Sequence, residues 1–224
     1  MPRPYSAVLF DLDGTIVDSA PGITATLAYT FERLQLPVPA PAELLRWVGP
    51  PILDSFRDLA GFDVEQSALA LEIYRARYLS TGVYDASIYT GVPEVLWAIA
   101  AAGLPLSLAT SKPETPARAV LSHFDLLEPF HELTGASDDE RRSAKKDVVE
   151  EALRRLRRRG SDLSRPVLIG DRHHDVDGAA HHGIPTIFVT WGYGSPAEQA
   201  GAVAVVDTPV ELLDVLGIDE QPAA

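Results

Sequence analysis

The sequence predicts an α/β fold built on a doubly wound parallel sheet, with an all-helical unit inserted after the first strand. Three observations lead to this prediction. Short apolar runs, each followed by a polar turn, recur along the chain and are typical of buried parallel strands. Helical patterns separate these runs. One long segment early in the chain shows helical periodicity and no strand, which indicates a separate helical unit.

The predicted strands are the apolar runs at residues 6–10, 104–109, 166–170 and 185–190. The predicted helices of the same domain cover residues 93–102, 114–124, 145–159 and 208–216. The inserted unit has helical patterns at residues 22–34, 40–48, 52–60 and 65–79. We therefore predict a core domain formed by residues 1–17 and 87–224 and a helical domain formed by residues 18–86. The last residues, 219–224, are expected to fray because chain ends have few contacts.

The composition excludes several classes of protein. Lysine and arginine number 19 against 32 acidic residues, which gives a formal net charge of −13. This balance argues against binding to a nucleic-acid polymer or to an anionic membrane, because both require clustered positive charge. There is no cysteine, so disulfides, thiol catalysis and cysteine-bound zinc are excluded. No stretch approaches the roughly 20 apolar residues of a transmembrane helix. A cytoplasmic protein, monomeric or homodimeric, is expected.

Two carboxylates directly follow the first apolar run, in the stretch "VLFDLDGT". In a parallel α/β sheet, ligands bind at the carboxyl ends of the strands, so Asp11 and Asp13 are expected at that edge. Such a pair suits a divalent cation, or a nucleophile beside a proton donor. Gly14 permits the sharp turn that this crowding requires. A solvated loop that begins the next helix is the alternative for a short motif of this kind.

Polar residues follow two other predicted strands. Asp171 and Asp175 come after the run at 166–170, and their spacing of four places them one helical turn apart if a helix begins there. Thr110 and Ser111 follow the run at 104–109 and supply hydroxyl groups. Because the carboxyl ends of parallel strands share one edge of the sheet, all four side chains are expected near the first acidic pair.

A lysine at a predicted helix start completes the set. Lys145 and Lys146 begin the helical pattern at 145–159, where a cation opposes the helix dipole, so a ligand is the better explanation for one of them. A carboxylate nucleophile, a second acid, a hydroxyl, an ammonium group and an acidic metal pair are what phosphoryl transfer through an aspartyl-phosphate requires. Lys112, after the hydroxyl pair, is expected either to touch the inserted unit or substrate, or to be solvated.

Four ordered motifs resemble those of the haloacid dehalogenase superfamily. They are "DLDGT" at 11–15, "ATS" at 109–111, "AKKDVV" at 144–149 and "GDRHHD" at 170–175. The chain is most similar to its phosphatases, in the branch of phosphoglycolate phosphatases and 5′-nucleotidases. The resemblance implies the Rossmann-like core of that superfamily and makes the helical insert its first-type cap domain.

The resemblance also implies roles for individual residues. Asp11 is the nucleophile on phosphorus, and Asp13 protonates the leaving oxygen and later deprotonates a water molecule. The phosphoryl oxygens are held by Thr110, Ser111 and one lysine, for which the pattern "KKDVV" favours Lys145 over Lys146.

A Mg²⁺ cofactor is implied by the same resemblance. Its donors are the side chain of Asp11, the backbone carbonyl of Asp13 and the side chain of Asp171, with Asp175 acting directly, through water or through lysine. Mg²⁺ prefers oxygen ligands and keeps several waters, which agrees with these residue types.

The expected reaction is hydrolysis of a small phosphate monoester, with phosphoglycolate and a nucleoside 5′-monophosphate both open as substrates. Specificity is expected from the cap loop at 46–51, where Gly49 breaks the helical pattern. Arg46 is expected either to meet a carboxylate or a nucleotide group, or to be a solvated arginine at a helix end. A sugar-phosphate mutase and a catalytically silent binding module on this fold are the alternatives. The glycine-rich stretch at 191–198 is expected to be a turn beside the site, because it lacks the spacing of a dinucleotide-binding loop.

Overall fold

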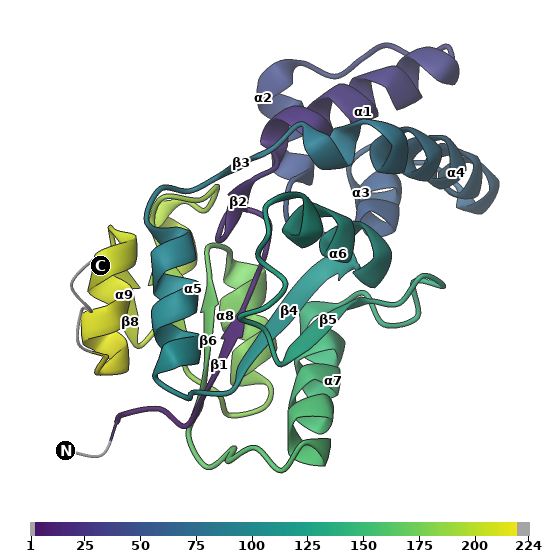
Figure 1. The fold of residues 1–224 in the computed structure, drawn as a ribbon. Helices are drawn as coiled ribbons and strands as arrows, with labels where there is room; N and C mark the ends of the chain where they lie inside the picture. The colour runs from purple at the N-terminus through teal and green to yellow at the C-terminus, as the bar shows by residue number, and fades with distance from the viewer. Residues whose placement is uncertain (1–2, 219–224) are drawn as a thin grey trace.

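The computed structural model describes residues 3–218, and the expected fraying of 219–224 lies outside them. A six-stranded sheet forms the core, in the order β5-β4-β1-β6-β7-β8 with every neighbouring pair parallel (Figure 1). The strands are β1 (Ala7–Phe10), β4 (Leu106–Pro113), β5 (Glu132–Ala136), β6 (Pro166–Gly170), β7 (Thr186–Val189) and β8 (Ala204–Val206). The predicted doubly wound α/β fold is confirmed.

Strand β1 lies in the middle of the sheet and is buried on both faces. It pairs with β4 on one side and β6 on the other, with Leu9 opposite Ser107 and Leu168. Successive side chains of a strand point to opposite faces. Val8 and Phe10 accordingly belong to one hydrophobic cluster, and Leu9 belongs to another. This double burial explains why the strand reads as one continuous apolar run.

Helices cover both faces of the sheet. On the Phe10 face pack α5 (Val92–Ala101), α6 (Glu114–His123) and α9 (Pro209–Leu216), whose buried residues share the larger cluster. On the Leu9 face pack α7 (Lys145–Arg158) and α8 (His173–Ala180). Helix α7 owes this position to an apolar stripe of Val148, Val149, Ala152 and Leu156, all fully buried.

The helical domain lies over the carboxyl ends of the strands (Figure 1). Its elements are α1 (Ala20–Arg33), α2 (Pro41–Leu44), the short 3₁₀ turn η1 (Leu45–Trp47), α3 (Ile52–Asp58), α4 (Val64–Ser80) and the 3₁₀ turn η2 (Gly82–Tyr84). Aromatic rings form its interior, with Trp47 edge-on to both Phe31 and Phe56. A two-stranded antiparallel pair, β2 (Val17–Asp18) and β3 (Ser87–Ile88), carries the chain into and out of this domain. The division at 17/18 and 86/87 stays a prediction.

The structure corrects several element predictions. Strands β5 and β8 were not predicted, because "ELTGA" is polar at its start and contains glycine, and β8 is a three-residue edge strand. Strand β4 continues to Pro113 rather than ending at residue 109. The helical pattern at 40–48 is two short turns, α2 and η1, rather than one helix. No helix among residues 3–218 is long and apolar enough to cross a membrane.

Candidate active site

The chain turns sharply immediately after β1. The amide of Asp11 still donates to the carbonyl of Ile169 at 2.9 Å, which continues the ladder between β1 and β6. Gly14 then adopts a φ of +83°, and its amide donates to the carbonyl of Val17 at 2.9 Å. This left-handed conformation is disfavoured for other residues. The turn keeps both Asp11 and Asp13 buried at the carboxyl edge of the sheet, about one-twentieth exposed.

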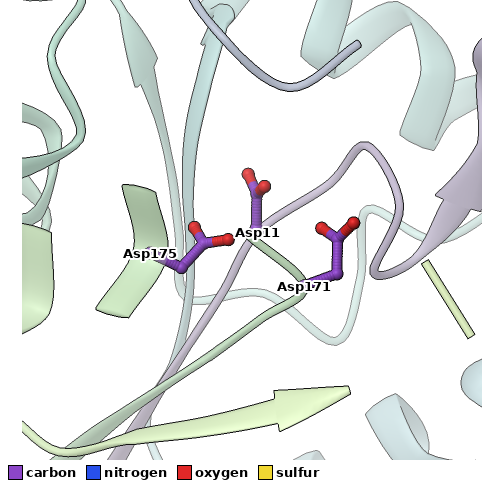
Figure 2. Close-up of side chains that lie close together, drawn as sticks. All are labelled: Asp11, Asp171 and Asp175. Atoms are coloured by element: carbon purple, nitrogen blue, oxygen red, sulfur yellow. The ribbon is translucent and has the colours of Figure 1, made fainter. Parts of the chain in front are cut away.

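Three buried aspartates meet at this edge. Figure 2 shows Asp11, which follows β1, between Asp171, which follows β6, and Asp175, in the first turn of α8. One carboxylate oxygen from each lies within 4.8 Å of the others. Asp171 and Asp175 therefore come together as expected, but not as neighbours on one helical turn, because α8 begins at His173 and Asp171 lies before it.

Lys145 provides the cation that contacts this cluster. Its Nζ lies 2.8 Å from Asp11 Oδ1 and 2.7 Å from Asp175 Oδ1, and it donates to the carbonyl of Ala109 at 3.0 Å. Lys145 is the first residue of α7, where the helix dipole disfavours a cation. Burial also lowers the pKa of an ammonium group, but the two carboxylates outweigh this and raise the pKa of Lys145 above its ordinary value.

The cluster keeps an excess of negative charge. Burial, together with Asp175 and Asp11, raises the pKa of Asp171 well above its ordinary value. Burial raises the pKa of Asp175 to about 6, although Lys145 opposes the shift. Three carboxylates around one ammonium leave two uncompensated charges when all are ionised. Hard oxygen donors, burial and excess negative charge together fit a divalent cation such as Mg²⁺.

Asp171 is held in place by groups from two distant segments. Thr15 Oγ1 donates to Asp171 Oδ1 at 3.2 Å, and the amide of Tyr193 donates to Asp171 Oδ2 at 2.7 Å. A Cβ added at Gly14 or Gly192 would lie 2.3 or 2.4 Å from Asp171 Oδ2, so both positions need glycine to admit this carboxylate. The glycine-rich stretch at 191–198 is thus a turn beside the site. Its role in holding Asp171 was not predicted.

Asp13 has surroundings of its own, on the side that faces the helical domain. Ser19 Oγ donates to Asp13 Oδ1 at 2.6 Å, and Lys112 Nζ lies 3.0 Å from Asp13 Oδ2. The same ammonium donates to the hydroxyl of Tyr78 on α4 at 2.9 Å. Lys112 is therefore buried between the two domains rather than solvated. The carboxylate of Asp13 is not part of the three-aspartate cluster, and its expected contribution to a metal is its backbone carbonyl.

The hydroxyl pair and the second lysine occupy different positions. Thr110 and Ser111 lie in the last part of β4 and are buried at the same edge of the sheet. Lys146 is exposed, and its backbone carbonyl is 2.7 Å from Nε2 of His182. Neighbouring residues of a helix point about 100° apart, so only one of the two lysines can face the carboxylates. The structure places Lys145 there.

Two cavities open between the domains. One of about 300 Å³ is lined by Asp13, and a neighbouring one of about 550 Å³ is lined by Lys145. Gly49 lines the first cavity with a φ of +105°, whereas exposed Arg46 lines the second. The two residues predicted for specificity are thus in different cavities.

A core arginine contacts the same cap loop. The guanidinium of Arg172 donates to the carbonyl of Val48 at 2.7 Å and pairs with Glu198 at 2.8 Å. Burial opposes ionisation of Glu198, but its bonds to Arg172 and His173 dominate and lower its pKa well below the usual range. Arg172 is therefore paired with an ionised carboxylate beside the loop.

Comparison with known proteins identifies the family. The family described as haloacid dehalogenase-like hydrolase matches residues 8–189, which include the three clustered aspartates, Asp13 and Lys145. The chain belongs to this family. The resemblance inferred from the four motifs is confirmed.

Several relatives of this haloacid dehalogenase-like hydrolase carry functional names. It is 42% identical over 188 residues to a protein of Mycobacterium tuberculosis (strain ATCC 25618 / H37Rv) named tyrosine-protein kinase PtkA, covering 84% of this chain and 62% of that protein. This chain thus spans less than two thirds of the mycobacterial relative's length. It is 36% identical to a 5′-nucleotidase of Pseudomonas aeruginosa, over 87% of this chain and 86% of the relative. It is 33% identical to a phosphoglycolate phosphatase of Rhodospirillum rubrum, over 96% of this chain and 92% of the relative.

A solved structure agrees with the fold of this family member. The structure, described as a predicted phosphatase from Clostridium acetobutylicum, is 36% identical in sequence and superposes with a TM-score of 0.87. The match covers 94% of this chain and 97% of that chain. It therefore extends over both the sheet and the helical domain.

Proposed function

We propose that this chain hydrolyses small phosphate monoesters through an aspartyl-phosphate formed on Asp11. The observation that carries the proposal is the contact of Asp11 with Lys145 beside two further buried aspartates, at the carboxyl edge of the sheet. Membership of the family and the phosphatase names of its relatives support it. A nucleophile, a fixed cation and a metal-type acidic cluster at one point suit transfer of a phosphoryl group.

In the first step, a carboxylate oxygen of Asp11 bonds to phosphorus while the bond from phosphorus to the ester oxygen breaks. Asp13, in its protonated form, gives its proton to that oxygen, so the leaving group departs as an alcohol. Lys145 and the hydroxyl groups of Thr110 and Ser111 hold the phosphoryl oxygens, whose charge they stabilise. Asp13 is held for this role by Ser19 and Lys112.

In the second step, Asp13 takes a proton from a water molecule whose oxygen bonds to phosphorus. The bond between phosphorus and Asp11 breaks and inorganic phosphate leaves. Both aspartates are then back in their starting forms, Asp11 ionised and Asp13 protonated. Asp11, Asp171, Asp175 and the backbone carbonyl of Asp13 would hold Mg²⁺. When bound, the ion neutralises charge on the carboxylates and on the phosphoryl oxygens.

The test is the fate of the phosphoryl group. The chain should release inorganic phosphate and alcohol in equal amounts from a phosphomonoester with Mg²⁺, and Asp11→Asn should reduce the rate at least 1,000-fold, to about the residual level of enzymes without their nucleophile. Because the amide is a far weaker nucleophile, a variant that kept a substantial rate would contradict the covalent mechanism.

Other products would identify the alternatives. Transfer of the phosphoryl group to a second sugar would favour a mutase, and binding without turnover would favour a silent module. The mycobacterial relative's name supports one further candidate, phosphoryl transfer to a tyrosine. Radioactive phosphate appearing on a tyrosine peptide rather than in solution would favour that activity.

A cytoplasmic location belongs to the same proposal and is supported by the acidic, cysteine-free composition.

A further inference from the structure

The position of Asp13 determines which cavity receives the leaving group. Asp13 lines the cavity of about 300 Å³ and not its larger neighbour, whereas Lys145 lines only the neighbour. Ser111 borders both cavities, as expected for a residue close to the transferred phosphoryl group. A leaving oxygen that receives its proton from Asp13 must belong to a group in the first cavity. We call this space the leaving-group cavity.

Its walls are mainly apolar and aromatic. Its apolar and aromatic lining includes Ile23, Trp47, Ile52, Tyr74 and Tyr78. Tyr74 and Tyr78 are stacked with ring centres 5.5 Å apart. Trp47 is fixed by its edge contacts with two phenylalanines of the cap. Flat, fixed walls of this kind suit a ring, and the volume lies at the lower end of the range for ligand pockets.

The leaving-group cavity has no cation to spare among residues 3–218. Its cations are Lys112, paired with Asp13 at 3.0 Å, and Arg75, paired with Glu140 at 2.5 Å. The other charged lining residue is Asp138, a further acid. A carboxylate in the leaving group would therefore meet the acids Asp138 and Glu140. Arg75 is already paired with Glu140, and Lys112 is already held by Asp13 and by the hydroxyl of Tyr78. Burying an unpaired charge is costly, so such a leaving group is disfavoured.

One hydroxyl group can recognise a neutral ring. The hydroxyl belongs to Tyr74, which lines the cavity and is only 7% exposed. Burial raises the pKa of Tyr74 well above its ordinary value, so this phenol remains neutral and can donate a hydrogen bond. Its position in the cavity wall makes an acceptor atom of a ligand a suitable partner for this hydroxyl.

We propose that the leaving group of the natural substrate is uncharged and contains a ring, and that the chain discriminates against carboxylate-bearing esters such as phosphoglycolate. The inference rests on the proposed hydrolysis, because the leaving group is defined by that reaction. A nucleoside and a simpler cyclic or aromatic alcohol share the required chemistry. Tyr74 distinguishes them, since a base offers acceptor atoms to its hydroxyl and a plain ring does not.

The experiment compares four esters of primary alcohols, so that the chemistry of the leaving oxygen is matched: ethyl phosphate, benzyl phosphate, adenosine 5′-monophosphate and phosphoglycolate. With Mg²⁺, kcat/KM should be at least tenfold higher for a ring-bearing ester than for phosphoglycolate. A ratio of about this size is expected when one buried carboxylate lacks a charge-assisted hydrogen bond. Equal or higher kcat/KM for phosphoglycolate would overturn the proposal. Tyr74→Phe should lower kcat/KM for the nucleotide several-fold but leave benzyl phosphate unchanged if the source is a nucleoside.

Calorimetry on Asp11→Asn measures the same ranking without turnover. Tighter binding of a ring-bearing ester together with no hydrolysis by the unmodified chain would reject the proposed function, while the preference of the cavity for an uncharged ring would stand as a binding property. Tighter binding of phosphoglycolate would reject this inference whatever the turnover.

A pair of charge variants tests the reason for the discrimination. Glu140→Gln releases Arg75 into the cavity and should raise kcat/KM for phosphoglycolate relative to benzyl phosphate by about tenfold, the value of a charge-assisted hydrogen bond. Asp138→Asn removes the same charge from the lining without releasing an arginine, and should change this ratio less than about twofold, as exposed charges do. If the two variants gave the same ratio, the paired state of Arg75 would not be the cause.

Discussion

Replacing Lys145 by methionine separates the electrostatic part of the site from its packing. The two side chains are similar in length, so Lys145→Met removes the ammonium group while largely filling its space. Wild-type Nζ contacts Asp11 and Asp175 at 2.8 and 2.7 Å, and both carboxylates are almost fully buried. The variant therefore leaves the three-aspartate cluster with no fixed cation.

The expected magnitude follows from this loss. Removing one partner of a buried ion pair costs about 3–5 kcal/mol of folding free energy, because it leaves an uncompensated charge. We expect this loss in EDTA and a smaller one in Mg²⁺, since a bound cation compensates the carboxylates. The rate of phosphomonoester hydrolysis should fall about 100- to 1,000-fold, as for other losses of one preorganised group on the reacting centre.

Urea unfolding in EDTA and in Mg²⁺, with initial rates on p-nitrophenyl phosphate, measures these effects. Lys146→Met is the matched control, because Lys146 is exposed and lies outside the carboxylate cluster. Its stability should change by less than about 0.5 kcal/mol, and its rate should be unchanged. If Lys145→Met is as stable as wild type in EDTA, or if Lys146→Met has the larger effect on rate, Lys145 is not the cation that compensates the carboxylates.

Two further predictions concern the metal and the join between the domains. Adding Mg²⁺ to protein treated with EDTA should restore activity and raise the melting temperature with increasing ion concentration. Asp171→Asn should abolish that rise. A melting temperature of the wild type that does not depend on Mg²⁺ would contradict the metal site. Tyr193→Phe removes a hydroxyl that donates to Asp18 at 2.7 Å and accepts from the amides of Ser19 and Ala20 at 2.8 and 3.0 Å. It should cost about 1–3 kcal/mol in chemical unfolding without weakening Mg²⁺ binding, because the backbone amide that holds Asp171 remains; unchanged stability would show that water replaces the phenol.

Those elements whose pattern is local were predictable from the sequence. The run before Asp11 is apolar at every position because β1 is buried on both faces, and a buried strand cannot accommodate polar side chains without partners. The turn at Gly14 is likewise local, since it depends on the backbone conformation of one residue. The approach of Asp171 to Asp175 does not follow from helical periodicity, because α8 begins only at His173. Strands β5 and β8 were missed because their short segments lack that continuous apolar pattern.

The contacts that complete the site depend on packing between segments far apart in the chain. Tyr193 reaches Asp171 by its amide and Asp18 by its hydroxyl, and no local pattern in "WGYG" encodes either partner. Lys112 is buried only because α4 of the helical domain brings Tyr78 over it. Arg75 is neutralised by Glu140, 65 residues later in the chain. Periodicity determines which side of an element a residue occupies, but the packing of the elements determines which partner the residue meets there. In this chain, that packing decides which cations are already paired and which can bind a substrate.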